Sequence, residues 1–563
     1  MRKCTNIVKR KHLCTMVTAL LLSSSWTGFA APSTEAPDAG QALRNSQNVG
    51  RSIPSIQNPN VEVGEVVRPP MPSDTGFKVQ VEQIEITGQD LFSQSELDEL
   101  LTDQLHKERT FTDLNQAAAT ITQYFKAHGY LLAQAYLPAQ EIGNGKVEIA
   151  VLVGRYGDVV LKNTSKVSDQ AIKKELIGLK PGSYINNSDL ERAVLLTGDL
   201  AGVAAKITLS PGKNPGTADV VVEAKTKEGG TKGYISFNNW GNRFIGSNQG
   251  TVSYTVGNAA HIGDNFIVGI SNAGSGLDVG NVNYSLPIAE GMNLNLGYSK
   301  VRYSLGADYA DLNAHGTAYT NHVDMTWNLK RSRDANINVV LGYDHKRMQD
   351  FTDATGIVTN KWDHAVSFGV TGDSLDTLWG GGANSYSLML YNGNLGAESN
   401  TTTPPVGSWN KFTYNVLRQQ NLNKRLSLQE SFSGQWASTT LDTSEKFSLG
   451  GANGVRAYPA DEASGDDAWL LNSELHWTIP VKSDKAVLQL IGFYDAGVSI
   501  LDKKASGTNG NRVALAGKGL GFSWIVPGEY SVKLNYAWKA SNTVATSDTD
   551  KDGRLWLQGV KYF

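Results

Sequence analysis

Apolar and polar residues alternate with a period of two through residues 229–563 of this 563-residue chain. In residues 530–538, for example, Tyr, Val, Leu, Tyr and Trp at the even positions alternate with Ser, Lys, Asn and Ala. One face of such a strand suits lipid and the other suits water, as in a closed transmembrane β-barrel. Beyond the N-terminus, no apolar run reaches the roughly 18 residues of a transmembrane helix. The pattern therefore predicts that this region crosses a membrane with strands.

Sixteen segments show this alternation, and an even number returns the chain to the side from which it started. They begin near residues 231, 246, 264, 277, 291, 316, 335, 360, 380, 407, 425, 469, 486, 511, 530 and 554. Short connections such as 421–425 mostly alternate with long ones such as 304–316 and 439–468. We expect the short connections to be periplasmic turns and the long ones to be extracellular loops.

The first thirty residues have the features of a Sec-type signal peptide. Five basic residues precede the apolar stretch 13–22, and small residues lead to a cleavage site after Ala30 or Ala31. Both cysteines, Cys4 and Cys14, lie in this segment, so the mature chain would contain none. That excludes disulfides, thiol catalysis and cysteine-ligated metals. The remainder has 46 Lys and Arg against 54 Asp and Glu, a sign opposite to that of a nucleic-acid binder.

Residues 31–76 are low in sequence complexity. A helix-compatible stretch at 41–47 precedes five prolines. This composition predicts a short helix on a semi-rigid tether, with a disordered tail as the alternative interpretation.

Two copies of a small α/β unit occupy residues 77–155 and 156–228. Each copy reads as a strand, two helices and two strands. Four apolar residues of 114–125 lie on one helical face, and Ser93 and Ser188 each open a helix with a Glu three positions later, as in a capping box. Neither copy contains a catalytic cluster, and repeated modules with exposed sheet edges are suited to bind extended chains.

The long connection 439–468 contains the sequence Val-Arg-Ala-Tyr at positions 455–458. A later strand carries Phe493 and Asp495, which alternation places on the lumen side. A carboxylate inside a barrel and an arginine on a long loop suit a charge-assisted pair that folds the loop inward. The plainer alternatives are a solvated arginine, a lumen acid without a special role and ordinary packing of Phe493.

Two apparent ligand motifs are dismissed. The aspartates of 548–552 imitate the start of a calcium loop, but its twelfth position is Gly559 rather than Glu. The glycines of 517–521 lie on a predicted strand, where they leave room in the lumen rather than bind a nucleotide. We expect no catalytic residue, no metal and no cofactor.

On these features the chain resembles the two-partner secretion transporter (TpsB) family, relatives of hemolysin and hemagglutinin secretion proteins within the Omp85 superfamily. The family motif is Val-Arg-Gly-Tyr, so Ala457 replaces the family glycine. The resemblance pairs Arg456 with Asp495. The expected loop–barrel latch consists of Val455, Arg456, Tyr458, Phe493 and Asp495. POTRA-like stretches occur at 136–140, 145–147, 199–203 and 210–212.

The resemblance covers the mature chain and implies α+β POTRA domains followed by a 16-stranded antiparallel transmembrane β-barrel. The expected organisation is a signal peptide (1–30), a plug helix and Pro-rich linker (31–76), POTRA 1 (77–155), POTRA 2 (156–228) and a barrel (229–563) whose loop 439–468 folds inward.

The resemblance also implies a function. The chain would export an unfolded, large β-helical exoprotein, of the adhesin, hemolysin or contact-dependent toxin type, across the bacterial outer membrane without ATP. Its expected partners are that TpsA-like exoprotein, captured by unassigned residues within 77–228, outer-membrane lipid, and the barrel assembly machinery during biogenesis. A monomer that binds no nucleic acid is expected. The alternatives are an Omp85-type barrel assembly factor, which usually carries more POTRA units, and a porin-like uptake channel, which needs none.

Overall fold

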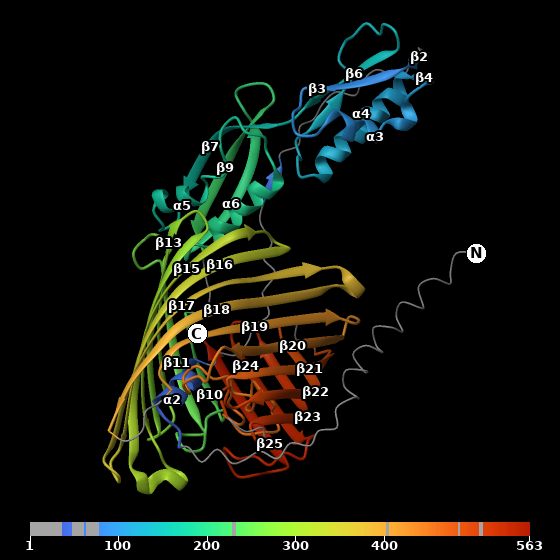
Figure 1. Cartoon of the computed structure of the whole chain (residues 1–563). Helices are drawn as coiled ribbons and strands as arrows, with labels where there is room; N and C mark the ends of the chain where they lie inside the picture. The colour runs from blue at the N-terminus through green and yellow to red at the C-terminus, as the bar shows by residue number, and fades with distance from the viewer. Residues whose placement is uncertain are drawn as a thin grey trace, which may run out of the picture.

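The computed structural model describes residues 36–47, 61–63, 78–227, 232–400, 405–481, 485–505 and 510–563. A closed barrel forms the largest part, and two small α/β domains extend from one end of it (Figure 1). The expected signal peptide and the five prolines of the linker lie outside the described residues. Within the described residues, no helix has both the length and the apolar character needed to cross a membrane.

The first α/β domain packs two helices against a small sheet. Its elements are β2 (Lys78–Val81), β3 (Gln83–Thr87), α3 (Gln94–Glu99), β4 (Lys107–Thr110), α4 (Phe111–Ala127), β5 (Gln134–Tyr136) and β6 (Lys146–Leu152). Strands pair in the order β3-β6-β5, and β2 pairs with β4. The predicted apolar face of α4, including Ile121 and Phe125, is buried against the sheet. Ser93 caps α3 as expected, because its side chain accepts the N–H of Glu96.

The second α/β domain repeats this plan. Its elements are β1 (Val61–Val63), β7 (Arg155–Asn163), α5 (Asp169–Glu175), α6 (Asn187–Asp199), β8 (Val203–Pro211) and β9 (Thr217–Thr226), with the strand order β1-β8-β9-β7. The capping box expected at Ser188 is wrong. The helix begins earlier, and the Asn186 side chain accepts the Ser188 N–H. Glu191 instead accepts the backbone N–H of Arg333 in a barrel turn.

Sixteen antiparallel strands close the barrel, and the last pairs with the first over five residues. The strands are β10 (Gly233–Asn238), β11 (Gln249–Gly257), β12 (Asn265–Asn272), β13 (Leu277–Ala289), β14 (Met292–Ser304), β15 (Ala314–Arg331), β16 (Ala335–Thr352), β17 (Ile357–Asp376), β18 (Gly382–Ser399), β19 (Gly407–Asn421), β20 (Leu426–Ala437), β21 (Asp467–Ile479), β22 (Val487–Ile500), β23 (Arg512–Val526), β24 (Tyr530–Lys539) and β25 (Gly553–Tyr562). Each begins within three residues of its predicted start.

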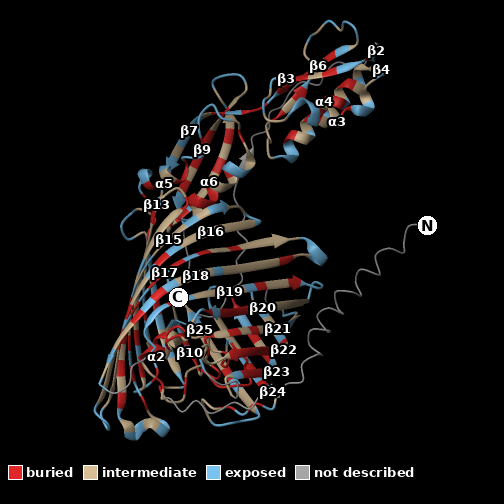
Figure 2. Cartoon of the chain, in the orientation of Figure 1, coloured by how far each residue is buried: buried red, intermediate tan, exposed pale blue. Residues whose placement is uncertain are grey.

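Burial alternates along the barrel strands, as a two-residue period requires (Figure 2). On β17, Lys361, Asp363 and Ala365 are buried, while the intervening Trp362 and His364 are exposed. The polar or small residues therefore face a filled lumen and the aromatic residues face outward.

Two segments fill the lumen. Helix α2 (Ala39–Gln47) lies within the barrel (Figure 1). Its residues Ala39, Ala42 and Leu43 pack against buried residues of the wall. The connection between β20 and β21, residues 438–466, packs Leu449 and Tyr458 against a second group of wall residues. The barrel core is therefore built partly from chain that does not belong to the wall.

Candidate functional site

Arg456 lies at the centre of a buried ion-pair cluster inside the barrel. Its Nε and Nη2 donate to the two carboxylate oxygens of Asp495, at 2.8 and 2.7 Å, and its backbone N–H donates to Asp495 Oδ2 at 3.1 Å. Its Nη1 donates to Glu474 Oε1 at 2.6 Å. Arg456 is 2% exposed and Asp495 is fully buried. The planar guanidinium therefore bonds a carboxylate in the two-point geometry that only arginine provides.

Neighbouring side chains fix the orientation of this arginine. Its guanidinium carbon lies 3.5 Å from the ring centroid of Phe493, which is a cation–π contact. The indole N–H of Trp556 donates to the Arg456 carbonyl at 2.7 Å. Asn472 Nδ2 donates both to Asp495 Oδ1 and to the carbonyl of Gly454, at 2.8 and 2.9 Å. Strands β21, β22 and β25 thus hold the tip of the loop.

The flanking residues of the motif pack the loop against the wall. Val455 is fully buried, and its N–H donates to the carbonyl of Leu449 at 2.8 Å. The Tyr458 hydroxyl donates to the carbonyl of Thr543 at 3.0 Å and lies 2.9 Å from Ser541 Oγ. The structure therefore brings together all five residues expected in the latch.

Ala457 fits because glycines lie opposite the loop. Its backbone φ is not in the positive region, so a side chain causes no strain there. A Cβ added at Gly517 would lie 2.7 Å from the Ala457 Cβ, and one added at Gly519 would lie 2.3 Å from Phe493 Cζ. Real Cβ atoms do not approach so closely. The glycines of this strand leave room in the lumen, as the sequence predicted.

A second cluster holds the N-terminal end of α2. Asp38 accepts a bond from Lys361 Nζ at 2.7 Å and from Thr443 Oγ1 at 2.7 Å. The same lysine donates to Asp442 at 2.8 Å. The backbone N–H of Ala39 donates to Asp350 Oδ1 at 2.7 Å. The start of the helix is therefore bonded both to the wall and to the loop.

The other end of α2 is bonded mainly to the loop. Arg44 Nη2 donates to Asp461 Oδ1 at 2.9 Å, and Arg44 Nη1 donates to the carbonyl of Thr443 at 2.8 Å. Asn45 Nδ2 donates to Asp461 Oδ2 at 2.7 Å. Asn242, which follows β10, donates to the same carboxylate at 3.1 Å. Asp461 thus links helix, loop and wall.

Glu445 bonds the same loop to two lysines of the wall. Lys346 on β16 forms an ion pair with Glu445, and Lys411 on β19 does so at 2.6 Å. All three side chains are nearly inaccessible to solvent. Because a buried charge left without its partner is costly, these pairs favour the loop inside the lumen over the loop in water.

Sequence reasoning missed several members of the clusters. Glu474 lies in the alternating segment that begins near residue 469, so its inward direction follows from the alternation, but its pairing with Arg456 does not. Nothing in the sequence singles out Lys361 or Asp461. Their partners are fixed by the path of the loop through the lumen.

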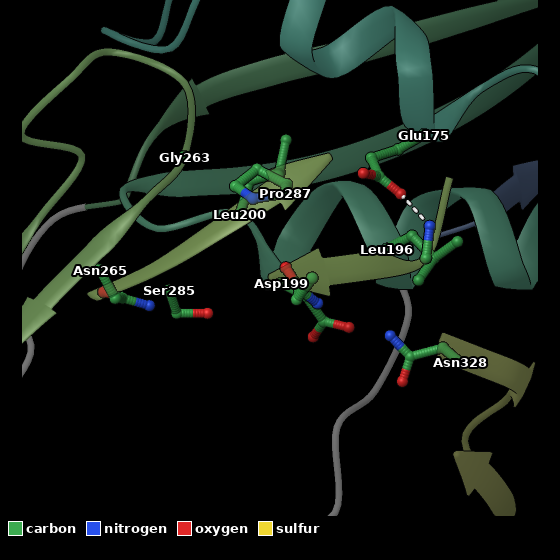
Figure 3. Close-up of a pocket in the computed structure, with 11 residues that line it drawn as sticks. Glu175, Leu196, Asp199, Leu200, Gly263, Asn265, Ser285, Pro287 and Asn328 are labelled. Atoms are coloured by element: carbon green, nitrogen blue, oxygen red, sulfur yellow. Dashed lines mark hydrogen bonds between the residues drawn. The ribbon is translucent and has the colours of Figure 1, made fainter. Parts of the chain in front are cut away.

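The second α/β domain contacts the barrel through polar groups at the turn between β13 and β14 and at the end of β15. Glu175 Oε2 accepts the backbone N–H of Gly291 at 2.8 Å (Figure 3). Arg192 pairs with Glu290 at 3.2 Å, and Asp199 receives two bonds from Arg331, at 2.7 and 2.8 Å. Burial raises the pKa of Glu175 to about 7, although the bond from Gly291 opposes this shift.

Within the described residues, no group of three potential metal ligands is present. In the lumen clusters Arg456 and Lys361 each bond two carboxylates, and Glu445 bonds two lysines. These ion pairs hold two segments inside the barrel. The fold is a closed barrel with two N-terminal α/β domains, and its lumen is filled by two segments that are not part of the wall.

Comparison with known families is specific. The sequence model of the family "Haemolysin secretion/activation protein ShlB/FhaC/HecB" matches residues 216–524, and that of "POTRA domain, ShlB-type" matches residues 79–154. The chain belongs to the haemolysin secretion/activation protein family ShlB/FhaC/HecB.

Several curated proteins are similar to this chain. The "Heme/hemopexin transporter protein HuxB" of Haemophilus influenzae is 26% identical over 94% of this chain and 95% of its own length. The "Outer membrane transporter CdiB" of Escherichia coli is 23% identical over 71% of this chain and 69% of its own length.

Solved structures share the fold. CdiB from Escherichia coli has a TM-score of 0.72 at 18% identity and full coverage of both chains. BamA from Haemophilus ducreyi, lacking POTRA domains 1–3, has a TM-score of 0.50 at 14% identity, over 86% of this chain and all of that one. The predicted fold class of POTRA domains followed by a 16-stranded antiparallel barrel is confirmed.

The predicted function is confirmed at the level of the family. The chain is an outer-membrane transporter of the two-partner secretion type, with its POTRA domains in the periplasm. Members of this family are transporters that act together with a secreted partner protein.

Proposed function

We propose that this transporter exports one large exoprotein in an unfolded form, and that α2 and residues 438–466 close the lumen until the exoprotein arrives. The observation that carries this proposal is the occupation of the lumen by two segments outside the wall, both held by buried ion pairs. An unfolded chain needs the space that these segments fill. Export therefore requires that they move.

Residues 455–458 form the loop side of the proposed latch. Arg456 and Asp495, with Val455, Tyr458 and Phe493, keep the loop in the single arrangement from which transport starts. Support comes from the two-point bonding of the guanidinium and from the buried position of both charges. Breaking the pair leaves an uncompensated charge, at a cost of about 3–5 kcal/mol.

Each part of the chain has a proposed role. Residues 1–30 direct export to the periplasm, 31–76 form the plug helix and linker, 77–155 and 156–228 capture the partner, and 229–563 form the pore. The sheets of both α/β domains have edge strands, and such edges accept an extended segment by strand addition. We propose that the N-terminal secretion domain of the exoprotein binds there.

The energy for export would come from the partner. The periplasm has no ATP, and no nucleotide site was recognised in either α/β unit. Folding of the exoprotein outside removes unfolded chain from the exit, and this shifts the equilibrium of transport outward. A β-helical partner folds progressively, because each repeat stacks on the preceding one.

The kind of cargo is suggested by the relatives. HuxB, which aligns with nearly the whole chain, is named a heme/hemopexin transporter, whereas CdiB aligns with a smaller share. This favours a partner that acts on heme or hemopexin over an adhesin, a hemolysin or a contact-dependent toxin. We propose further that the transporter is a monomer in outer-membrane lipid, is inserted by the barrel assembly machinery, binds no nucleic acid, needs no cofactor and catalyses no reaction.

An Omp85-type assembly factor is the second candidate, because BamA has the same fold. It is less supported, since the matched family model is that of secretion proteins and covers most of the barrel.

Deletion of the gene tests the function. We expect one large exoprotein to move from the cell surface or medium into the periplasm, measured by fractionation and immunoblot, while other outer-membrane barrels keep their levels. A general fall in outer-membrane barrels would support the assembly factor instead.

A further inference from the structure

Strands β14 and β16 carry positive charges on the outer face of the barrel. On β14, Val301 and Tyr303 are buried in the lumen. Because side chains alternate between the two faces of a strand, Lys300 and Arg302 point outward. On β16, Lys346 pairs with Glu445 in the lumen.

The same alternation continues on the next strands. His345 and Arg347 flank the inward Lys346 and therefore point outward, and so does His364 between the buried Asp363 and Ala365 on β17. We call the cations Lys300, Arg302 and Arg347, together with the neighbouring His345 and His364, the cationic patch.

The register of the strands brings these residues together. Tyr319 on β15 pairs with Lys300 on one side and with Arg347 on the other, so the two cations are two strands, about 10 Å, apart. His345 pairs with His364, and their rings stack with centroids 4.4 Å apart. Arg347 Nε lies 3.2 Å from His345 Nε2. The patch therefore spans β14 to β17, with Tyr319 of β15 between Lys300 and Arg347.

The cations of the patch differ from those of the lumen in lacking acidic partners. Within the described part of the chain, Lys300, Arg302 and Arg347 form no ion pair, whereas Lys346 and Lys361 each bond a carboxylate. The outward acids nearby are Asp278, opposite Arg302 and hydrogen-bonded to Asn272, and Glu398 at the rim of β18. The strand positions of Lys300 and Arg347 have no acid opposite them.

The position along the strands places the patch at the outer edge of the membrane. Arg302 lies ten positions beyond Met292, where β14 leaves the turn that contacts the second α/β domain. A transmembrane strand takes about 9–11 residues to cross the bilayer. The outward residues closer to that turn are apolar, including Leu294, Leu341 and Phe368.

Aromatic residues accompany the cations. Tyr298, Tyr343 and Trp362 point outward at the same level, as in the girdle where a barrel meets lipid headgroups. Lys300 Nζ lies 6.0 Å from the ring centroid of Tyr319.

We propose that the cationic patch binds the phosphate groups of the glycolipid in the outer leaflet of the outer membrane. Guanidinium groups bond phosphate in a two-point geometry, and an ammonium group adds a point charge beside it. The cations without an ion pair, the aromatic girdle and the level at which they lie all match an anionic headgroup held against the barrel wall. This site is independent of export and of the identity of the cargo.

Binding of lipid A to the purified full-length protein in detergent tests the site. The patch variant is Arg302→Gln/Arg347→Gln. The matched control is Lys518→Gln/Lys561→Gln, which removes two outward cations on β23 and β25 and changes the net charge equally. Heat-dependent migration on a gel checks that both barrels are folded.

We expect the patch variant to bind bisphosphorylated lipid A at least about tenfold more weakly than the native protein, as loss of charge-assisted bonds predicts. The control should bind within about twofold of the native protein, because exposed single charges contribute little. Dephosphorylated lipid A should bind the native protein as weakly as lipid A binds the patch variant. Equal binding of the two lipids, or equal losses in patch variant and control, would overturn the proposal.

Discussion

The loop and the helix that share the lumen are held in different ways. Arg456 at the loop tip has all its polar partners on strands of the wall, at Asp495, Glu474 and Trp556. Helix α2 has its polar partners divided between the wall, through Lys361 and Asp350, and the loop, through Thr443 and Asp461. The tip of the loop is therefore held by the wall alone, whereas the helix is held partly by the wall and partly by the loop.

This difference implies an order of events. A helix that leaves the lumen breaks the ion pairs of Asp38 with Lys361 and of Arg44 with Asp461, and it exposes Ala39, Ala42 and Leu43. A loop that leaves must break a bidentate, fully buried pair and also removes half of the helix's partners. We therefore expect the helix to be released without the loop, but not the loop without the helix.

The largest effect should follow from removing the ion pairs that hold the loop tip to the wall. Arg456→Ala leaves Asp495 and Glu474 buried without their cation, at a cost of about 3–5 kcal/mol. We expect secretion of the exoprotein, measured by immunoblot of the medium, to fall at least tenfold, while the barrel still inserts and migrates as a folded species. Asp495→Ala should behave alike.

Arg456→Lys is the informative companion of this variant. It keeps the charge but loses the two-point geometry, so secretion should be intermediate. Loss of folded barrel in both alanine variants would contradict a role specific to secretion.

Removing the helix should increase the conductance of the pore but leave the loop in its place. Deletion of residues 36–47 empties the space beside β14–β18 but leaves the Arg456 cluster intact. We expect the conductance in planar bilayers to rise several-fold and the loop to keep its protection from proteases. A loop that becomes cleavable after this deletion would refute the proposed order.

A larger residue on the wall opposite the loop tip tests how much the packing of Phe493 contributes to holding the loop. Gly519→Val places a side chain where Phe493 Cζ now lies, and so displaces the ring that stacks on Arg456. We expect a partial loss of secretion, a few-fold, with α2 still bound. Gly492→Val is the matched control, because nothing lies within 4 Å of its added Cβ. Equal losses in the two variants would argue against packing at Phe493.

The smallest effect concerns the junction outside the lumen. The pKa of Glu175 is raised to about 7 from its ordinary value of 4.5, so the docked domain holds a proton that the undocked domain releases. Docking should therefore weaken as pH rises from about 4.5 to 7, by about 3 kcal/mol at most, and stay constant above that range. Hydrogen exchange of α5 measures this change. Glu175→Gln should remove it, and an unchanged pH profile in that variant would exclude Glu175 as the cause.

The barrel could be predicted from the sequence because its signal is local. A period of two, repeated sixteen times, fixes both the strands and the direction of each side chain, so Phe493 and Asp495 were placed in the lumen correctly. Arg456 was recognised because an arginine on a long loop and a carboxylate inside a barrel are unusual in combination.

Other features depend on the path of the chain in three dimensions. The partners of Lys361 come from α2 and from the loop, 323 and 81 residues away in sequence. Trp556 donates to a backbone carbonyl, and every residue has such a group, so the sequence does not indicate this bond. Asn186 replaced Ser188 as the cap because both residue types suit that position and only the start of the helix decides between them.

A crosslink between helix and loop tests the central claim most directly. Asp38 and Thr443 are in hydrogen-bond contact, and the only natural cysteines, Cys4 and Cys14, lie in the expected signal peptide. Asp38→Cys/Thr443→Cys would be joined by a short bismaleimide in intact cells, with each single-cysteine variant treated alike as a control. If the lumen must be cleared for export, secretion should stop in the crosslinked protein and continue in the uncrosslinked variant and both controls. Secretion that continues at the same rate after crosslinking would contradict the account.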